Sequence, residues 1–145
     1  GTCAIGIEST IVNLIGRPSI LRLGSLDILK IQKTLGFKIN ASINPKKKIA
    51  PGQSRLHYSP GIPLRMNIIK PKDNEAFIVI KKRKNKLKNY FYLTTKNNLD
   101  KAAKNLYSCL RKIKNKGYNS IAVEKIPNTG IGKAINDRLS RASKY

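Results

Sequence analysis

The feature of this sequence that most constrains its fold is an amphipathic helix pattern that starts at residue 99. Apolar residues recur with i, i+3, i+4 and i+7 spacing, and Lys and Arg lie opposite them; the apolar positions are Leu99, Ala102, Ala103, Leu106, Leu110 and Ile113. This spacing predicts a helix with one buried face, and Gly117 is expected to end it. A buried face requires a core, and the hydrophobic fraction of 40% is sufficient for one.

Short segments rich in β-branched and aromatic residues precede and follow this helix. We predict strands over 64–69, 76–80, 90–93 and 120–123, and a last helix over 132–142. Strands that alternate with helices predict a small parallel or mixed sheet covered by helices, which is an α/β fold.

The first 43 residues predict a hairpin, a helix and a further extended segment. β-branched residues dominate the first strand of the hairpin, and a turn containing glycine and proline separates the two strands. Ser25 can cap the helix and Gly36 can end it. The expected bounds are 1–13 and 19–23 for the strands, 26–35 for the helix and 37–43 for the extended segment.

Residues 44–61 have a different composition and predict a linker or an ordered loop between domains. A polar, basic start is followed by prolines and glycines around the only histidine, His57. A long loop that holds His, Arg and Tyr side chains is typical of an active-site cover, although a rigid strap between domains would have the same composition. We therefore divide the chain into domains at 1–43 and 62–145, joined by this linker.

The net charge of +23 has two explanations. It could serve a polyanionic partner such as RNA, held through phosphates. It could also reflect AT-rich coding, because the excess is mostly Lys and accompanies many Asn and Ile residues. The basic residues are spread along the whole chain and few aromatic residues lie among them, so we favour the compositional explanation.

Cysteine and histidine usage argues against a disulfide or a zinc site. Cys3 and Cys109 are far apart in the sequence and form no CxxC motif, so reduced core thiols are expected. With a single histidine, a zinc site from this chain alone is not expected. No apolar run approaches the ~18 residues that span a bilayer, so we expect no membrane segment in the sequence as given. The chain opens on Gly1 and runs directly into an apolar stretch, which we interpret as truncation.

Besides the linker loop, two local features could carry chemistry. Ser9 and Thr10 interrupt a β-branched run, and their hydroxyls need partners that could be backbone or a small polar substrate. Arg22 lies in an apolar strand, where it could reach solvent or clamp a phosphate. The glycine pair at Gly130 and Gly132 is not a phosphate loop, because Pro127 stands where a Walker motif needs glycine; a turn at the start of a helix explains it better.

Four segments, taken in this order, resemble the L-threonylcarbamoyladenylate synthases of the YrdC/Sua family, in the longer form with an added C-terminal domain. The segments are Gly6-Ile7-Glu8-Ser9-Thr10-Ile11-Val12, then Ile20-Leu21-Arg22, then Pro51-Gly52 with His57-Tyr58-Ser59-Pro60, and last Gly130-Ile131-Gly132-Lys133-Ala134-Ile135-Asn136-Asp137-Arg138-Leu139. Each segment is short, but together they span nearly the whole chain. The resemblance implies an α/β protein in which 1–43 is a remnant of a YrdC-like catalytic domain and 62–145 is a small Rossmann-like βα domain.

The resemblance also implies a reaction. These cytoplasmic nucleotidyltransferases condense L-threonine, bicarbonate and ATP to threonylcarbamoyl-AMP and pyrophosphate. A tRNA threonylcarbamoyl transferase complex then uses that product to form threonylcarbamoyladenosine in tRNA. By this analogy Ser9 contacts L-threonine, Arg22 and His57 bind ATP, and Tyr58 is a weaker candidate for the nucleotide. Mg²⁺ is expected to accompany the ATP, and no residue is assigned as a catalytic group or a metal ligand.

The chain also departs from the family pattern. Asn13 stands where Asp is usual, Leu23 where Pro is usual, and Gln53 where Met or Thr is common. The family's Lys-x-Arg and Ser-x-Asn motifs, which hold most of the nucleotide site, are missing. We therefore predict that the chain is part of a synthase and has no synthase activity alone.

Two other functions remain open at this point. The first is a basic RNA-binding module, in which residues 62–145 hold tRNA and the motifs around Ser9 and Arg22 are only structural. The synthase hypothesis itself also includes a weak contact with tRNA. The second is a structural domain that steadies the linker over another subunit's site.

Overall fold

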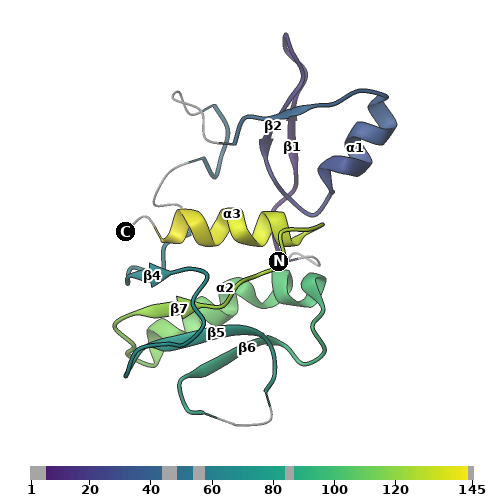
Figure 1. The fold of residues 1–145 in the computed structure, drawn as a ribbon. Helices are drawn as coiled ribbons and strands as arrows, with labels where there is room; N and C mark the ends of the chain where they lie inside the picture. Colours follow the sequence, from purple (N-terminus) through teal and green to yellow (C-terminus); the bar gives the residue numbers. More distant parts are fainter. Residues whose placement is uncertain (1–5, 44–48, 54–57, 84–86, 144–145) are drawn as a thin grey trace.

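A computed structural model describes residues 6–43, 49–53, 58–83 and 87–143. Two sheets lie on opposite sides of helix α3, the smaller one with helix α1 and the larger one with helix α2 (Figure 1). The elements in chain order are β1 (Ile11–Asn13), β2 (Ser19–Arg22), α1 (Ile28–Leu35), β3 (Asn40–Ala41), β4 (Leu64–Arg65), β5 (Ala76–Lys81), β6 (Tyr90–Thr94), α2 (Leu99–Asn115), β7 (Ile121–Val123) and α3 (Gly132–Ala142).

The larger sheet has the strand order β4-β7-β5-β6, and every neighbouring pair is parallel. Helix α2 provides the crossover from the edge strand β6 to the inner strand β7, as parallel pairing requires. The chain passes from β5 to its parallel neighbour β6 without a helix among the described residues of that connection. The α/β class expected from the sequence is confirmed.

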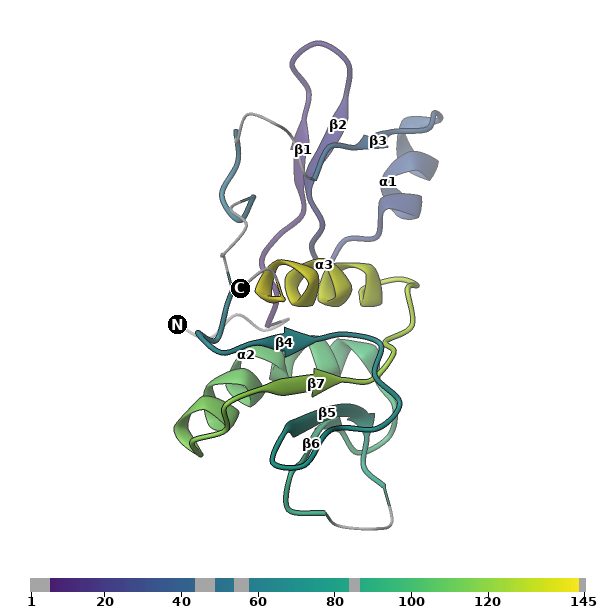
Figure 2. The same ribbon diagram turned by 60° about the vertical axis from the view of Figure 1, so that its left-hand side comes forward.

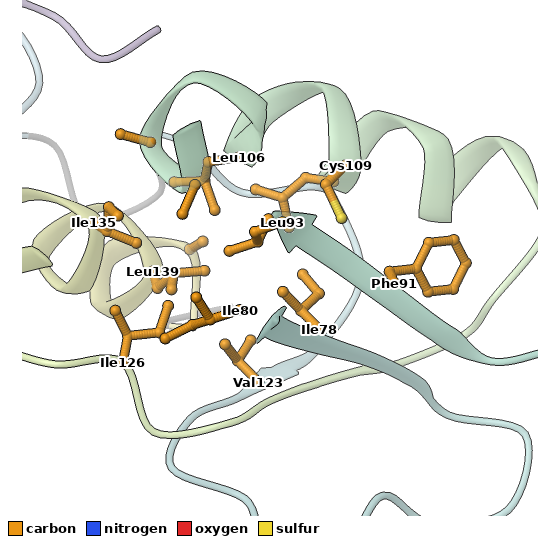
Figure 3. Close-up of a cluster of buried hydrophobic side chains, with 14 of the residues drawn as sticks. Ile78, Ile80, Phe91, Leu93, Leu106, Cys109, Val123, Ile126, Ile135 and Leu139 are labelled. Carbon is orange, nitrogen blue, oxygen red and sulfur yellow. The ribbon is translucent and has the colours of Figure 1, made fainter. Parts of the chain in front are cut away.

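The core of this sheet lies under α2 and α3. Alternate residues of β5 face opposite sides: Ala76, Ile78 and Ile80 join the helix side, while Phe77 and Val79 belong to a separate cluster on the other face. In Figure 3 the side chains of β5, β6 and β7 gather beside those of the two helices. The whole run 76–80 is buried, as is typical of strands in a parallel sheet.

The smaller sheet has the strand order β1-β2-β3. Strands β1 and β2 form the predicted antiparallel hairpin, with an irregular step between Ile11 and Val12. Strand β3 pairs with β2 in parallel, and α1 connects the two. We refer to residues 1–43 as the front segment. Its described part is a hairpin followed by a short β-α-β crossover.

Several predicted bounds are wrong. Asp27, not Ser25, caps α1, because its carboxylate accepts a hydrogen bond from the amide of Leu29 at 2.9 Å. The predicted strand 64–69 ends at Arg65, because Asn67 has a φ of 59° and interrupts the regular pairing with β7, although the amide of Ile68 still donates to the carbonyl of Val123 at 2.9 Å.

The predicted strands of the front segment are also too long. Gly6 lies in a bend with a φ of 75°, so the strand predicted over 1–13 starts only at Ile11, and residues 1–5 lie outside the described part. The extended segment predicted over 37–43 contains only the short strand β3.

The helix predictions near the C-terminus are confirmed. Helix α2 begins at Leu99, and α3 spans the predicted 132–142. A Cβ on Gly132 would lie 2.0 Å from the carbonyl oxygen of Pro127, which confirms that this glycine serves a tight turn into the helix. Among the described residues, no helix is both long and apolar enough to cross a membrane.

Candidate functional site

The structure brings two of the predicted site residues together. Arg22, at the end of β2, donates from Nε to the carbonyl oxygen of Ser9 at 3.1 Å and from Nη2 to the Ser9 hydroxyl at 3.3 Å. Ser9 is exposed and Arg22 is half-buried. A guanidinium has five N–H donors, so Arg22 can hold Ser9 and still offer donors to an anion at the surface.

Gly24 sets the spacing of this pair. A Cβ at Gly24 would lie 2.2 Å from the amide nitrogen of Thr10 and 2.4 Å from the carbonyl carbon of Ser9. The segment after β2 therefore lies directly against the backbone that precedes β1. Thr10 donates its hydroxyl to the carbonyl of Leu26 at 3.0 Å, so its hydroxyl has a backbone partner.

The first described part of the linker is anchored to the small sheet by Gln53. Its amide oxygen accepts from the backbone of Ile49 and Ala50, and its amide nitrogen donates to the carbonyls of Leu21 and Ser42 at 3.0 and 3.4 Å. Gln53 is buried. Gln53, one of the three residues that depart from the family pattern, thus joins the linker to β2.

Gly52 places the linker against Arg22. A Cβ on Gly52 would lie 3.2 Å from Cδ of Arg22 and 2.5 Å from the hydroxyl oxygen of Tyr58. The φ of 83° at Gly52 favours glycine. Tyr58 therefore approaches the Ser9–Arg22 pair, while His57, the residue before it, lies outside the described residues.

Three side chains hold Tyr58 in this place, those of Glu8, Tyr107 and Arg138; we refer to these residues together with Tyr58 as the linker cluster. The Tyr58 and Tyr107 rings stack with centroids 5.6 Å apart, and the Arg138 guanidinium lies 5.0 Å from the Tyr58 centroid. Glu8 accepts from the Tyr107 hydroxyl at 3.2 Å and from Nε of Arg138 at 3.1 Å. In chain order these residues come from the chain before β1, the linker, α2 and α3.

The charges of the linker cluster suit it to hold the linker in place. Burial raises the pKa of Glu8, but a backbone hydrogen bond, the charge of Arg138, and hydrogen bonds from Tyr58 and Arg138 together lower it below its ordinary value. Burial raises the pKa values of Tyr58 and Tyr107. At neutral pH the cluster therefore holds one carboxylate, one guanidinium and two neutral phenols, and none of these groups is poised to transfer a proton.

Helix α3 ties the front segment to the larger sheet. Arg138 donates to the carbonyl of Leu23 at 2.7 Å, and Arg141 donates to the carbonyl of Ile43 at 2.6 Å. Asp137 accepts from both arginines and aligns them. Figure 2 shows α3 lying between the two sheets. The segment 1–43 is thus bonded to this helix both after β2, at Leu23, and at its end, at Ile43.

Sequence reasoning missed most of the linker cluster. The sequence patterns indicated roles for Ser9, Arg22 and Tyr58, but none for Glu8, Tyr107 or Arg138. One signal was available: Arg138 falls between Ile135 and Leu139 on the apolar face of α3, where a charged residue needs a partner. In the part of the chain that the structure describes, no three His, Cys, Asp or Glu side chains gather as metal ligands. Burial raises the pKa of Cys109 to about 12, so this thiol stays protonated.

Comparison with known proteins identifies the family. The family model for the C-terminal domain of threonylcarbamoyl-AMP synthase matches residues 25–144. The chain belongs to this family. Among the curated relatives, the threonylcarbamoyl-AMP synthases of Pyrococcus abyssi and Bacillus subtilis are 28% and 26% identical over 100% and 99% of this chain, and it covers 48% and 47% of them. The one from Schizosaccharomyces pombe is 26% identical over 99% of the chain, which covers 43% of it.

Solved structures of the Sua5 protein from Pyrococcus abyssi have the same fold. One, a complex with L-threonine, superposes with a TM-score of 0.79 at 26% identity, covering 97% of this chain and 47% of the other. The second is a variant in which a histidine and the tyrosine that follows it are both replaced by alanine; its TM-score is 0.77 at 25% identity, covering 97% and 46%. The family member described here spans about half the length of the curated relatives that it matches.

Proposed function

We propose that this chain is the C-terminal part of a cytoplasmic synthase, a nucleotidyltransferase that makes threonylcarbamoyl-AMP, pyrophosphate and water from L-threonine, bicarbonate and ATP. The product would serve a transferase complex that forms threonylcarbamoyladenosine in tRNA. The family membership and the relatives named threonylcarbamoyl-AMP synthase support this proposal. The observation that carries it is the direct bonding of Arg22 to Ser9, beside a linker that packs on Arg22.

We assign L-threonine to Ser9 and the phosphates of ATP to Arg22. In the transfer step a carbamate oxygen forms a bond to the α-phosphorus of ATP, and the bond from that phosphorus to the bridging oxygen breaks, so pyrophosphate leaves with the electron pair. This step needs aligned reactants and neutralised phosphate charge more than it needs covalent help from the protein. One arginine that holds the threonine contact and also faces a phosphate would couple the two substrates.

His57 is assigned to the nucleotide as part of the same proposal. It is the only histidine of the chain, and Tyr58 follows it. In a solved variant of the Pyrococcus abyssi relative, a histidine and the tyrosine that follows it are both replaced by alanine, and this chain has the same dipeptide in its linker. Stacking on Tyr107 and the guanidinium of Arg138 hold the ring of Tyr58, the residue that follows His57 in the sequence. Mg²⁺ is expected with the ATP, but the described carboxylates do not gather to bind it, so no step is derived through the ion.

The front segment has an uncovered apolar face, which supports the proposal that the catalytic domain is incomplete here. Helix α1 has no buried residue, and Leu14 and Ile15 are 71% and 88% exposed. A groove of about 350 Å³ runs between α1 and the end of β1; its apolar lining residues are Val12, Leu14, Leu26, Ile31 and Leu35. We propose that the preceding half of the catalytic domain covers this face, so 1–43 remains its remnant and 62–145 the accessory domain.

The test of the proposed site is pyrophosphate release by this chain mixed with the preceding catalytic half. We expect no release from the chain alone and release from the mixture. Ser9→Ala, Arg22→Ala and His57→Ala should each lower kcat/KM by at least tenfold, Ser9→Ala through KM for threonine and the other two through KM for ATP. Arg17→Ala, in an exposed turn, is the matched control and should leave KM for threonine and KM for ATP unchanged.

Two outcomes would contradict this assignment. Robust release from the chain alone would show that no other half is needed. An inert mixture, together with RNA binding by the chain, would favour the second candidate, a basic RNA-binding module without catalysis.

The apolar face gives a separate prediction about association. Leu14→Glu places a charge in the groove, so we expect it to weaken binding of the catalytic half at least tenfold, while Leu14 is exposed enough that the fold of the chain is unchanged. Sedimentation velocity measures the binding, and far-UV circular dichroism checks the fold. Lys33→Gln, on exposed α1, makes the same change in charge away from the groove and should bind as the wild type does. Equal binding by the Leu14 variant would exclude this face as the contact.

A further inference from the structure

The acidic residues of this protein are used mainly to pair arginines. The chain has 30 Lys and Arg but only 7 Asp and Glu residues. Each ion pair within the described residues joins an arginine to one of four acids, which are Glu8, Glu75, Glu124 and Asp137. No lysine of the described residues enters an ion pair. The uncompensated positive charge of the described surface is therefore mostly lysine charge.

Five of these lysines line two adjoining grooves at one edge of the larger sheet. The first groove, of about 680 Å³, is lined by Lys70, Lys72 and Lys88. The second, of about 400 Å³, is lined by Lys88, Lys112 and Lys116. Lys88 and Tyr90 line both grooves, so the two hollows share part of their wall. Asp73 is the only acidic residue among their lining residues.

The grooves also contain aromatic residues. Tyr90 packs edge-on against Phe77 with centroids 5.2 Å apart, and Tyr118 packs edge-on against Phe91 at 5.5 Å. These contacts fix rings that line the first groove. Fixed rings beside phosphate-binding charges are the combination that single-stranded nucleic acid uses, because bases stack on the rings and lysines neutralise the backbone.

The grooves lie away from the proposed synthase site. Strand β6, which carries Tyr90, is the edge strand of the larger sheet, whereas Arg22 ends β2 of the smaller sheet, which lies on the other side of α3 (Figure 1), and Ser9 is bonded to Arg22. A ligand bound there would leave the substrates of the proposed reaction undisturbed. A flat membrane surface would not enter a concave groove, so a flexible polyanionic strand is the better fit.

We propose that the two grooves form an RNA-binding surface that takes a single-stranded segment, with phosphates along the five lysines and a base against the ring of Tyr90. This surface is an activity separate from the synthesis of threonylcarbamoyl-AMP. It also assigns part of the large positive charge to a defined place rather than to composition alone.

The test measures fluorescence anisotropy of a labelled single-stranded RNA of about 16 nucleotides with the whole chain over a range of salt concentrations. Replacing Lys88, Lys112 and Lys116 by Gln should weaken binding at least tenfold at about 50 mM salt and reduce the slope of log K against log salt by about 2. The control replaces Lys33, Lys38 and Lys101, which are exposed and outside the grooves, by Gln. It makes the same change in net charge and should reduce binding far less.

Three outcomes would overturn the proposal. Equal losses in both triple variants would show that the charge acts diffusely and that the grooves are not a site. Absence of binding at low salt would exclude an RNA surface. Equal binding of single-stranded DNA of the same sequence would overturn the assignment to RNA. None of these outcomes depends on synthase activity, so failure here and failure of the proposed reaction are distinguishable.

Discussion

Replacing Arg138 by methionine is expected to lower the free energy of unfolding by about 3 kcal/mol, the largest effect of any single side chain in the linker cluster. The Arg138 side chain is only 1% exposed and bonds to Glu8, Asp137 and the carbonyl of Leu23. Methionine has a similar length and fills most of the space, so the loss reports missing charge and hydrogen bonds. The value is placed at the lower end of the range for broken buried pairs, because the Glu8 side chain remains 32% exposed.

Urea unfolding followed by far-UV circular dichroism measures this change. The matched control is Arg83→Met, because Arg83 makes an ion pair with Glu124 at 2.8 Å but keeps 46% of its side chain exposed. An exposed pair of this kind contributes little, so the control should lose less than about 1 kcal/mol. Equal losses in the two variants would mean that burial of Arg138 adds nothing to its contribution.

The difference in the free energy of unfolding between wild type and Arg138→Met should depend on pH because of Glu8. Its folded-state pKa is lowered below 4.5, since Arg138 and several hydrogen bonds outweigh the effect of burial. A carboxyl with a lowered folded-state pKa stabilises the fold above its unfolded pKa, and this contribution is lost as the pH falls through the folded pKa. The gap between wild type and Arg138→Met should therefore be widest near neutral pH and should narrow below 4.5. A gap that does not change with pH would assign the effect to the bond with Leu23.

The sequence predicts best the elements whose signal is local. The 3.6-residue periodicity of α2 is visible within one segment, and Gly117 follows its end. In contrast, Ser25 and Asp27 are both residue types that can cap the N-terminus of α1, so residue type alone does not choose between them. The choice depends on where the chain leaves β2, which tertiary packing decides. Strand β4 was overestimated for a related reason: the sequence of 64–69 has the right residues, but Asn67 adopts a left-handed turn.

The candidate site shows the same division. Ser9 and Arg22 could be proposed because each disturbs an apolar strand locally, and the structure places them in contact. The linker cluster could not be derived in this way. Glu8 and Arg138 are 130 residues apart and Glu8 and Tyr107 are 99 apart, so no sequence window contains both partners. Only the position of α3 between the sheets brings them together.

Replacing Gly24 by alanine is expected to cost about 3 kcal/mol of stability and to disturb the proposed threonine site at the same time. The new Cβ would lie 2.2 Å from the amide nitrogen of Thr10, 2.4 Å from the carbonyl carbon of Ser9 and 2.5 Å from the carbonyl oxygen of Glu8. All three are backbone atoms, so no flexible side chain can move aside. The chain around Ser9 must shift away from β2, and the Arg22–Ser9 hydrogen bonds must lengthen or break.

Two measurements separate the structural and functional parts of this effect. Urea unfolding of the chain reports the cost of the displaced backbone, and KM for L-threonine in the mixture with the catalytic half reports the displaced Ser9. Ser25→Ala is the control, because Ser25 is adjacent but does not cap α1, so it should change stability by less than about 0.5 kcal/mol. If Gly24→Ala lowered stability but left KM for threonine at its wild-type value, Ser9 would not be a threonine contact. If both quantities were unchanged, the close approach of the two segments would not be required, and the role assigned to Gly24 would be wrong.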